Sequence, residues 1–325
     1  MVTAVTSVSV GAKTSEVNEL SEPIVYLNGN LVPASQASIN IYDWGIVLGA
    51  TLTEMTRTFR HKSFRVEDHV ARLYRSMNYA GIDPGFGQAE MVEKTEAVIA
   101  HNCGLIDAAD DLGVVHFVTP GENRMYAGSI KSSTRMEPTI CIHSFPLPFG
   151  EFRHNFTDGV HVVTPSIRHI PPQCIDPKMK NRSRLHWFIG DQQSRNVDPH
   201  ATSLLLDLEG NITECSGANF VVINDRTIYS PTSRNILQGV SLVTVRELAG
   251  KLGWDCVEKD MQPYDVVNAD EAWLTTTPYC LAPVTRINNR PIGAGRPGPC
   301  FHEMMSAWSD LAGMDVLGQI MGEKA

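Results

Sequence analysis

Several signatures of common protein classes are missing from this 325-residue sequence. It contains no run of about 18 apolar residues, so we expect no transmembrane helix. None of its seven cysteines forms a CxxC pair and none of its 11 histidines lies in an HExxH motif, which argues against a zinc site and a disulfide framework. No GxGxxG follows a predicted strand and no Walker loop is present, which excludes dinucleotide and P-loop nucleotide binding.

Positive charge is also scarce. The chain has 27 Lys and Arg against 36 Asp and Glu, a net charge of −9, which argues against a protein that coats nucleic acid. Residues 1–21 are small and polar and lack the basic start and apolar core of a secretory signal, so we expect an arm that is disordered or loosely packed. Unpaired cysteines indicate a reducing, cytoplasmic location.

What is present is an ordinary globular composition with 42% hydrophobic residues. Short strands and hairpins outnumber helices, which predicts a mixed α/β (α+β) fold without strict βαβ alternation. Residues 146–159 hold two prolines, two glycines and three phenylalanines, the composition of a packed interdomain linker. We therefore predict a small α/β domain at 22–145 and a larger domain at 160–325.

Basic residues gather in one place, the stretch DPKMKNRSR at 176–184. Lys180 follows a proline-containing loop and comes shortly before a predicted helix, so its side chain could point into a cavity. The simpler interpretation is a solvated basic surface, and the stretch alone does not decide between them.

Four further features belong to the same question. Glu214 ends a predicted strand and precedes a Cys-Ser-Gly turn, and Arg72 lies on a predicted helix. LQGVS at 237–241 opens a helix, whose free N–H groups attract anions, and TTTP at 275–278 offers hydroxyls. Pyridoxal phosphate requires a lysine amine, a carboxylate for its ring nitrogen and a phosphate cradle with an arginine, so the set suggests this cofactor without proving it.

Several stretches, in order along the chain, then resemble one family. They are HVARL (69–73), KNRSRLHWFIGDQQS (180–194), LLLDLEGNITECSGANF (204–220), IYSPTSRNILQGVS (228–241) and WLTTTPYCLAPV (273–284). From about residue 24 to 290 the chain is similar to the class IV, fold-type IV pyridoxal-phosphate enzymes. These include branched-chain and D-amino-acid aminotransferases, R-selective amine transaminases and aminodeoxychorismate lyase.

The resemblance implies a role for particular residues. Lys180 matches the Schiff-base lysine and general acid–base, Glu214 the carboxylate at the ring nitrogen, and Arg72 the phosphate arginine. Leu237 matches an aliphatic residue that packs on the ring, and the phosphate-cradle positions fall on Val240, Ser241 and Thr277.

The resemblance also implies the architecture: a smaller N-terminal α/β domain, a larger C-terminal barrel-like domain and pyridoxal 5'-phosphate between them. The family is at least dimeric, and a loop of the partner subunit usually completes the active site. We therefore expect a homodimer with small-molecule substrates and neither nucleic acid nor membrane as a partner.

Substrate residues match the family less closely. Thr53 stands where these aminotransferases usually carry an aromatic residue. Arg124 and Tyr126 have the spacing of the Arg-x-His carboxylate clamp of D-amino-acid aminotransferases, and Arg124 read alone is a solvated loop residue. Pro278, in the TTTP turn, completes the predicted substrate residues.

Three functions stay open from these residues. The leading hypothesis is an aminotransferase that moves an amino group from an amino acid, branched-chain-like or D, or from an amine to a 2-oxo acid. The second is 4-amino-4-deoxychorismate lyase, whose active-site threonine is Glu54 here, a glutamate typical of aminotransferases. The third is a non-catalytic phosphate- or nucleic-acid-binding protein that uses residues 178–184.

Overall fold

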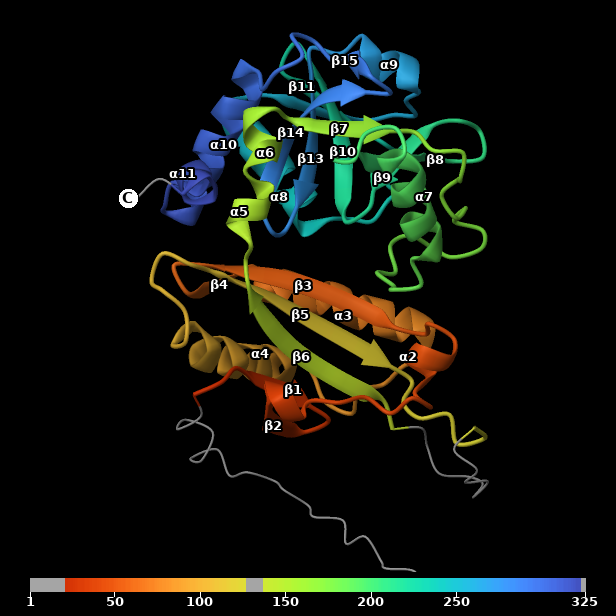
Figure 1. Cartoon of the computed structure of the whole chain (residues 1–325), viewed down its shortest axis with the longest axis vertical. Helices are drawn as coiled ribbons and strands as arrows, with labels where there is room; N and C mark the ends of the chain where they lie inside the picture. Colours follow the sequence, from red (N-terminus) through yellow and green to blue (C-terminus); the bar gives the residue numbers. More distant parts are fainter. Residues whose placement is uncertain (1–20, 127–136, 323–325) are drawn as a thin grey trace, which may run out of the picture.

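The computed structural model describes residues 21–126 and 137–322, so the predicted arm at 1–20 lies outside the described residues. The described chain forms two units, each built on its own sheet (Figure 1). We call them the N-terminal unit and the C-terminal unit.

The N-terminal unit is an antiparallel sheet covered by two helices. Its strands, in the order in which they pair, are β2 (Asn30–Pro33), β1 (Ile24–Leu27), β6 (Thr139–Pro146), β5 (Leu112–Thr119), β3 (Leu52–Phe59) and β4 (Lys62–Phe64). The helices are α3 (Val66–Ala80) and α4 (Gln88–Cys103), with short turns η1 (Ala34–Gln36) and α2 (Trp44–Val47) between strands. The stretch IVYLNGNLVP at 24–33 predicts a hairpin with Asn28-Gly29 at its turn, and the antiparallel pairing of β1 with β2 confirms it.

Alternation along β3 and β5 gives this sheet two different faces. Leu52, Val114 and Val118 pack with the apolar residues of α3 and α4. Thr53, Met55 and Val115 turn the other way and line a cavity toward the C-terminal unit. The N-terminal unit therefore presents one strand face to its own core and the other to its neighbour.

The C-terminal unit is built on a barrel-like sheet, as predicted. Its strands pair in the order β12 (Asp255–Glu258), β11 (Thr227–Ser230), β10 (Ala218–Asn224), β13 (Glu271–Thr276), β14 (Cys280–Ile287), β7 (Val160–Val163), β8 (Thr202–Leu206) and β9 (Ile212–Cys215), with β15 (Arg290–Pro291) beside β14. Because β9 also pairs with β10, the path from β10 through β9 closes on itself. The helices are α7 (Leu185–Arg195), α8 (Val240–Leu252), α9 (Pro263–Val267), α10 (Pro299–Ala312) and α11 (Val316–Met321).

Two connections join the units. Short helices α5 (Phe149–Phe152) and α6 (His154–Thr157) lie between β6 and β7, and Phe149 and Phe156 are buried in the large apolar core. The loop around Lys180 pairs with the start of β3: the Thr53 N–H donates to the Lys180 carbonyl at 2.9 Å, and the Arg182 N–H to the Thr51 carbonyl at 2.8 Å. No helix of the described ranges is long and apolar enough to cross a membrane.

Candidate active site

A cavity of about 520 Å³ lies between the two units. Its walls come from β3, the loop after Lys180, the β9–β10 turn, the start of α8 and the β13–β14 turn. The structure brings nine of the predicted site residues into these walls: Thr53, Arg72, Lys180, Glu214, Leu237, Val240, Ser241, Thr277 and Pro278.

Lys180 lies in the cavity wall, partly exposed to the cavity, with its backbone held by the N-terminal unit. Besides the bond to Thr53, its N–H donates to the Ser76 hydroxyl at 3.3 Å. Burial, followed by the nearby guanidinium of Arg184, lowers the pKa of Lys180 to about 8. A larger neutral fraction at moderate pH makes this amine a nucleophile and a base.

Lys178, two residues earlier, is different. Its side chain is 54% exposed and pairs with Asp176 at 3.3 Å. Only the second lysine of the basic run enters the cavity.

Glu214, on β9, is buried and held by two neutral donors. Its Oε2 accepts hydrogen bonds from Asn219 Nδ2 at 3.0 Å and from the Leu237 N–H at 3.1 Å. Its Oε1 lies 3.7 Å from His169 Nε2. Glu214 and Lys180 both line the main cavity and a smaller hollow of about 50 Å³ behind it, so the carboxylate and the amine border the same space.

The start of α8 faces the cavity without a side-chain cap. Its N-cap is Gly239, and no side chain accepts from the first-turn N–H groups. A Cβ at Gly239 would lie 2.1 Å from Asn219 Oδ1, so glycine is required for this close approach. The open N–H groups and the Ser241 side chain form a site suited to an anion.

Arg72 lies beside this helix start and is oriented by Glu54. The Glu54 carboxylate accepts from Arg72 Nε at 2.7 Å and from Nη2 at 2.6 Å, and Arg72 Nη1 donates to the Gln238 carbonyl at 2.6 Å. Although burial opposes ionisation, Arg72 and His69 hold the pKa of Glu54 well below its usual range. The glutamate that the sequence marked as aminotransferase-like is therefore the partner of Arg72.

Arg124 and Tyr126 do not lie in the walls of this cavity. Arg124 lines a separate hollow on the N-terminal unit beside Lys94, and Tyr126 is 59% exposed. Within a single chain, the predicted carboxylate clamp is therefore remote from Lys180.

The sequence did not identify every residue of the cavity wall. The charged wall residues that it left unassigned are Arg182 and Arg184. Arg182 Nε donates to the Thr53 hydroxyl at 3.0 Å, and its guanidinium lies 5.8 Å from the Phe117 ring centroid. The sequence did contain a signal for these two arginines, because both belong to the same basic run as Lys180. Neutral wall residues such as Tyr279 had no comparable signal.

The groups in the cavity fit pyridoxal phosphate. The amine, the buried carboxylate, the uncapped helix start and Arg72 all border this one space. The Thr275 hydroxyl, in the same wall, is buried without a partner among the described residues, so it can donate to a bound group. The described residues contain no cluster of ligands for a metal ion.

Comparison with known proteins places the chain in a class. A family model described as amino-transferase class IV matches residues 51–287, most of the chain. The chain belongs to this family. The family resemblance, the predicted fold and the aminotransferase assignment are thereby confirmed, and the lyase alternative is not favoured.

Individual relatives are more distant. D-alanine aminotransferase of Bacillus licheniformis is 27% identical over 87% of this chain and 95% of its own. A putative branched-chain-amino-acid aminotransferase of Methanocaldococcus jannaschii is 27% identical over 88% of this chain and 96% of its own. The solved branched-chain amino acid aminotransferase of Escherichia coli shares the fold with a TM-score of 0.81 and 20% identity, covering 94% of this chain and 96% of the other.

Proposed function

We propose that this protein is a pyridoxal-phosphate-dependent aminotransferase that moves an amino group from an amino acid to a 2-oxo acid. The observation that carries the proposal is the meeting of Lys180 and Glu214 in one cavity with an uncapped helix start flanked by Arg72. Family membership agrees with it.

When bound, pyridoxal phosphate supplies an aldehyde that exchanges amino groups and a ring that takes up the electrons released at the substrate carbon. Glu214 is positioned to hold a proton on the ring nitrogen, since its carboxylate is fixed by Asn219 and Leu237. Lys180 would hold the aldehyde end of the cofactor and would carry a proton to and from the substrate carbon during transfer. Arg72, Ser241, Thr277 and the start of α8 would hold the phosphate.

The amino donor is proposed from the relatives and the cavity wall. The relatives are named for D-alanine and branched-chain amino acids, all of which carry a carboxylate. Arg182 lies in the wall beside Thr53, and its two terminal nitrogens have no hydrogen-bond partner among the described residues. An arginine with free donors binds a carboxylate in a two-point contact.

We also propose a homodimer in the cytoplasm. Large apolar side chains are exposed at Ile46 (64%), Leu48 (67%), Leu185 (70%) and Phe188 (60%). They belong to two segments that meet where the Ser183 hydroxyl donates to the Gly49 carbonyl at 2.6 Å. A patch of this kind is typical of a subunit interface. In such a dimer, the partner subunit's Arg124 and the partner subunit's Tyr126 would reach the site and act on substrate. All seven cysteines are free thiols, as in a reducing compartment.

The two units are proposed to be the predicted domains, divided at the predicted linker. The first sheet ends at Pro146 and the second begins at Val160. Between them lie only α5 and α6.

The test of the function is the absorption spectrum of the purified protein after loading with pyridoxal phosphate. We expect a yellow band that pools of L-amino acids, D-amino acids or simple amines convert to the pyridoxamine form, and the effective pool identifies the donor. Lys180→Ala should lose the band, and Lys178→Ala should keep it, because that lysine is exposed. A wild-type protein with no band would contradict the proposal, and a band that stays while pyruvate is released from 4-amino-4-deoxychorismate would favour the lyase.

A further inference from the structure

Besides Arg72 on α3, a second arginine is buried: Arg57 on β3, to which the proposed function gives no role. Arg57 is 1% exposed, and its guanidinium lies 3.9 Å from the centroid of the Phe59 ring. Its Nε donates to the Thr58 carbonyl at 2.9 Å. A buried charge is stable only when its remaining donors are satisfied, so its other partners show what it holds.

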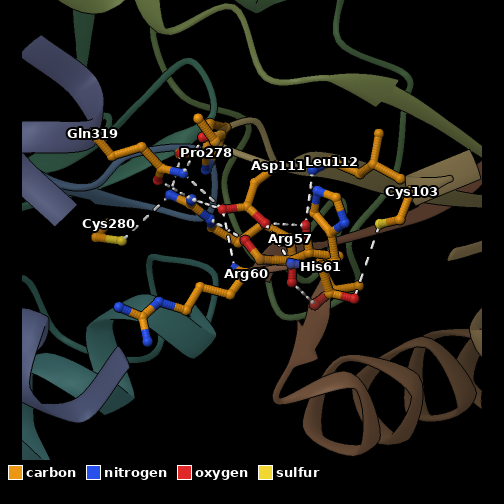
Figure 2. A network of polar contacts seen from close by, with 12 residues as sticks. Arg57, Arg60, His61, Cys103, Asp111, Leu112, Pro278, Cys280 and Gln319 are labelled. Atoms are coloured by element: carbon orange, nitrogen blue, oxygen red, sulfur yellow. Dashed lines mark hydrogen bonds and ion pairs between the residues drawn. The ribbon is translucent and has the colours of Figure 1, made fainter. Parts of the chain in front are cut away.

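Two of these partners lie at the loop between β13 and β14 (Figure 2). Arg57 Nη1 donates to the Pro278 carbonyl at 2.9 Å and lies 3.9 Å from the Cys280 sulfur. Cys280 has a φ of 66°, a left-handed conformation that residues other than glycine rarely adopt. A strained backbone of this kind persists when surrounding contacts hold it, and Arg57 supplies two of them.

The third partner comes from the C-terminal helix α11. Arg57 Nη2 donates to Gln319 Oε1 at 3.0 Å, and Gln319 Nε2 donates to Asp111 Oδ2 at 2.7 Å and to the Ala109 carbonyl at 3.1 Å. Asp111 lies 3.7 Å from Arg57 Nη2 and completes the network. Gln319 lies beyond the residues that match the family model, which end at 287.

Arg57 acts behind the cavity wall. The wall residues of β3 are Thr53 and Met55, and the Met55 carbonyl accepts from the Thr277 hydroxyl at 3.4 Å. The loop at 277–279 is thus attached to β3 at two points, once through Thr277 and once through Pro278. One strand of the N-terminal unit sets the position of a loop that belongs to the C-terminal unit.

We propose that Arg57 is a positioning residue for the phosphate end of the cavity. By holding Pro278 and Cys280, it places the Thr277 hydroxyl against a phosphate monoester or a free phosphate ion, and Gln319 orients Arg57. The inference rests on the proposed function, which assigns the phosphate to Thr277 and Ser241. Arginine is required because its planar fork reaches three chain segments at fixed angles, whereas a lysine ammonium is a compact point charge.

The test measures phosphate binding to the cofactor-free protein with two probes. Pyridoxal phosphate is titrated by absorbance, and inorganic phosphate by the rise in the thermal midpoint. We expect Arg57→Lys to raise the Kd for both probes by about 10- to 100-fold, the usual effect of losing a residue that orients a ligand-binding group. Gln319→Leu, far from the cavity, should raise both by about three- to tenfold.

A matched control lies at the start of β13, at the end of that strand away from the 277–279 loop. The Glu271 carboxylate accepts from the Cys300 N–H at 2.8 Å and the Phe301 N–H at 2.9 Å, where α10 begins. Glu271→Gln should lower the thermal midpoint but change neither Kd by more than about twofold. A merely structural role for Arg57 predicts that all three variants lose affinity in proportion to their loss of stability.

The outcomes distinguish a failure of the inference about Arg57 from a failure of the proposed function. Folded Arg57→Lys protein with both Kd values within about twofold of wild type overturns the inference, as does an equal loss in Glu271→Gln. If Arg57→Lys does not fold, Gln319→Leu decides by the same measurements. Wild-type protein that binds inorganic phosphate but not pyridoxal phosphate contradicts the proposed function, and the inorganic probe still tests Arg57.

Discussion

Two charged clusters meet strand β3 only three residues apart, and they are built in opposite ways. Glu54 faces α3 and pairs with Arg72 through two short hydrogen bonds inside the N-terminal unit. Arg57 faces the C-terminal unit, and most of its bonds go to neutral acceptors. Its nearest carboxylate, Asp111 of the N-terminal unit, is 3.7 Å away. Alternation along the strand sends the two side chains to opposite faces.

The difference teaches how one strand can serve two purposes. The Glu54–Arg72 pair lies within one unit and orients the guanidinium of Arg72 toward the cavity. Glu54 binds two of its nitrogens, and the third, Nη1, donates to the Gln238 carbonyl. An arginine spread over several segments orients backbone instead, and it joins the units. Breaking the Glu54–Arg72 cluster should therefore affect both the stability of the protein and the charge in the cavity. Breaking the Arg57 cluster should affect mainly the position of the loop at 277–279.

The largest effect is expected from Glu54→Gln. Arg72 then stays buried without a counter-charge, and we expect the free energy of unfolding to fall by about 3–5 kcal/mol. Urea unfolding of the cofactor-free protein measures this. Glu247→Gln removes the surface partner of Arg65 and should change stability by less than about 1 kcal/mol. Equal losses of unfolding free energy in Glu54→Gln and Glu247→Gln would contradict the prediction that the buried pair stabilises the protein more than the surface pair does.

A double variant then separates stability from binding. Arg72→Met added to Glu54→Gln removes the uncompensated charge, so we expect about 1–3 kcal/mol of the lost stability to return. Pyridoxal phosphate should nevertheless bind weakly, because the arginine that we propose holds the phosphate is gone. Recovery of both properties, measured by urea unfolding and absorbance titration, would mean that Arg72 serves only the fold.

A smaller effect is expected at Arg182, which lines the cavity and donates to Thr53 on the face of β3 that also carries Arg57. Arg182→Leu should raise the KM for donors with a carboxylate by about tenfold and leave kcat nearly unchanged, since a charged hydrogen bond contributes about 1.5–3 kcal/mol. Simple amines, which lack the carboxylate, should show no change. Arg195→Leu, exposed at the end of α7, is the matched control. An unchanged KM for amino acids would rule out this contact.

The smallest expected effect is a shift in pH dependence. Neutral Lys180 takes up pyridoxal phosphate, so the uptake rate of the cofactor-free protein should rise with pH through about 8. Glu54 is one of the groups that raise the pKa of Lys180, so Glu54→Gln should move this midpoint to lower pH, by less than about one unit. Gln319→Leu, in the other cluster, should leave it in place. Stopped-flow absorbance over pH 6–10 gives the midpoints.

The same pKa shift affects stability, and its sign is fixed. The folded pKa of Lys180 lies below the ordinary lysine value, so between about pH 8 and 10.5 the unfolded chain holds more protons. This group therefore makes the folded state more stable as pH rises through that window. Lys180→Met should remove this part of the slope in urea unfolding.

Much of the local structure followed from the sequence. The Asn28-Gly29 turn, the helical spacing after Val66 and the glycine at 81 predicted β1, β2 and α3. The lysine at 180 and the glutamate at 214 were found by residue type and order, and they lie in one cavity. The interior partners of Glu54 and Arg57 were not found, because they come from chain segments between 15 and 262 residues away.

The sequence by itself determined which chemical groups the protein owns and which short elements carry them, since turns, helix ends and strand alternation depend on neighbouring residues. Only the tertiary structure decided which groups meet. It put Lys180 in the cavity wall and left Lys178 exposed, gave Arg72 to Glu54 and placed Arg57 behind the cavity loop. It also kept Arg124 away from the cavity of its own chain. Burial and distance set these choices, and both arise only when remote segments pack together.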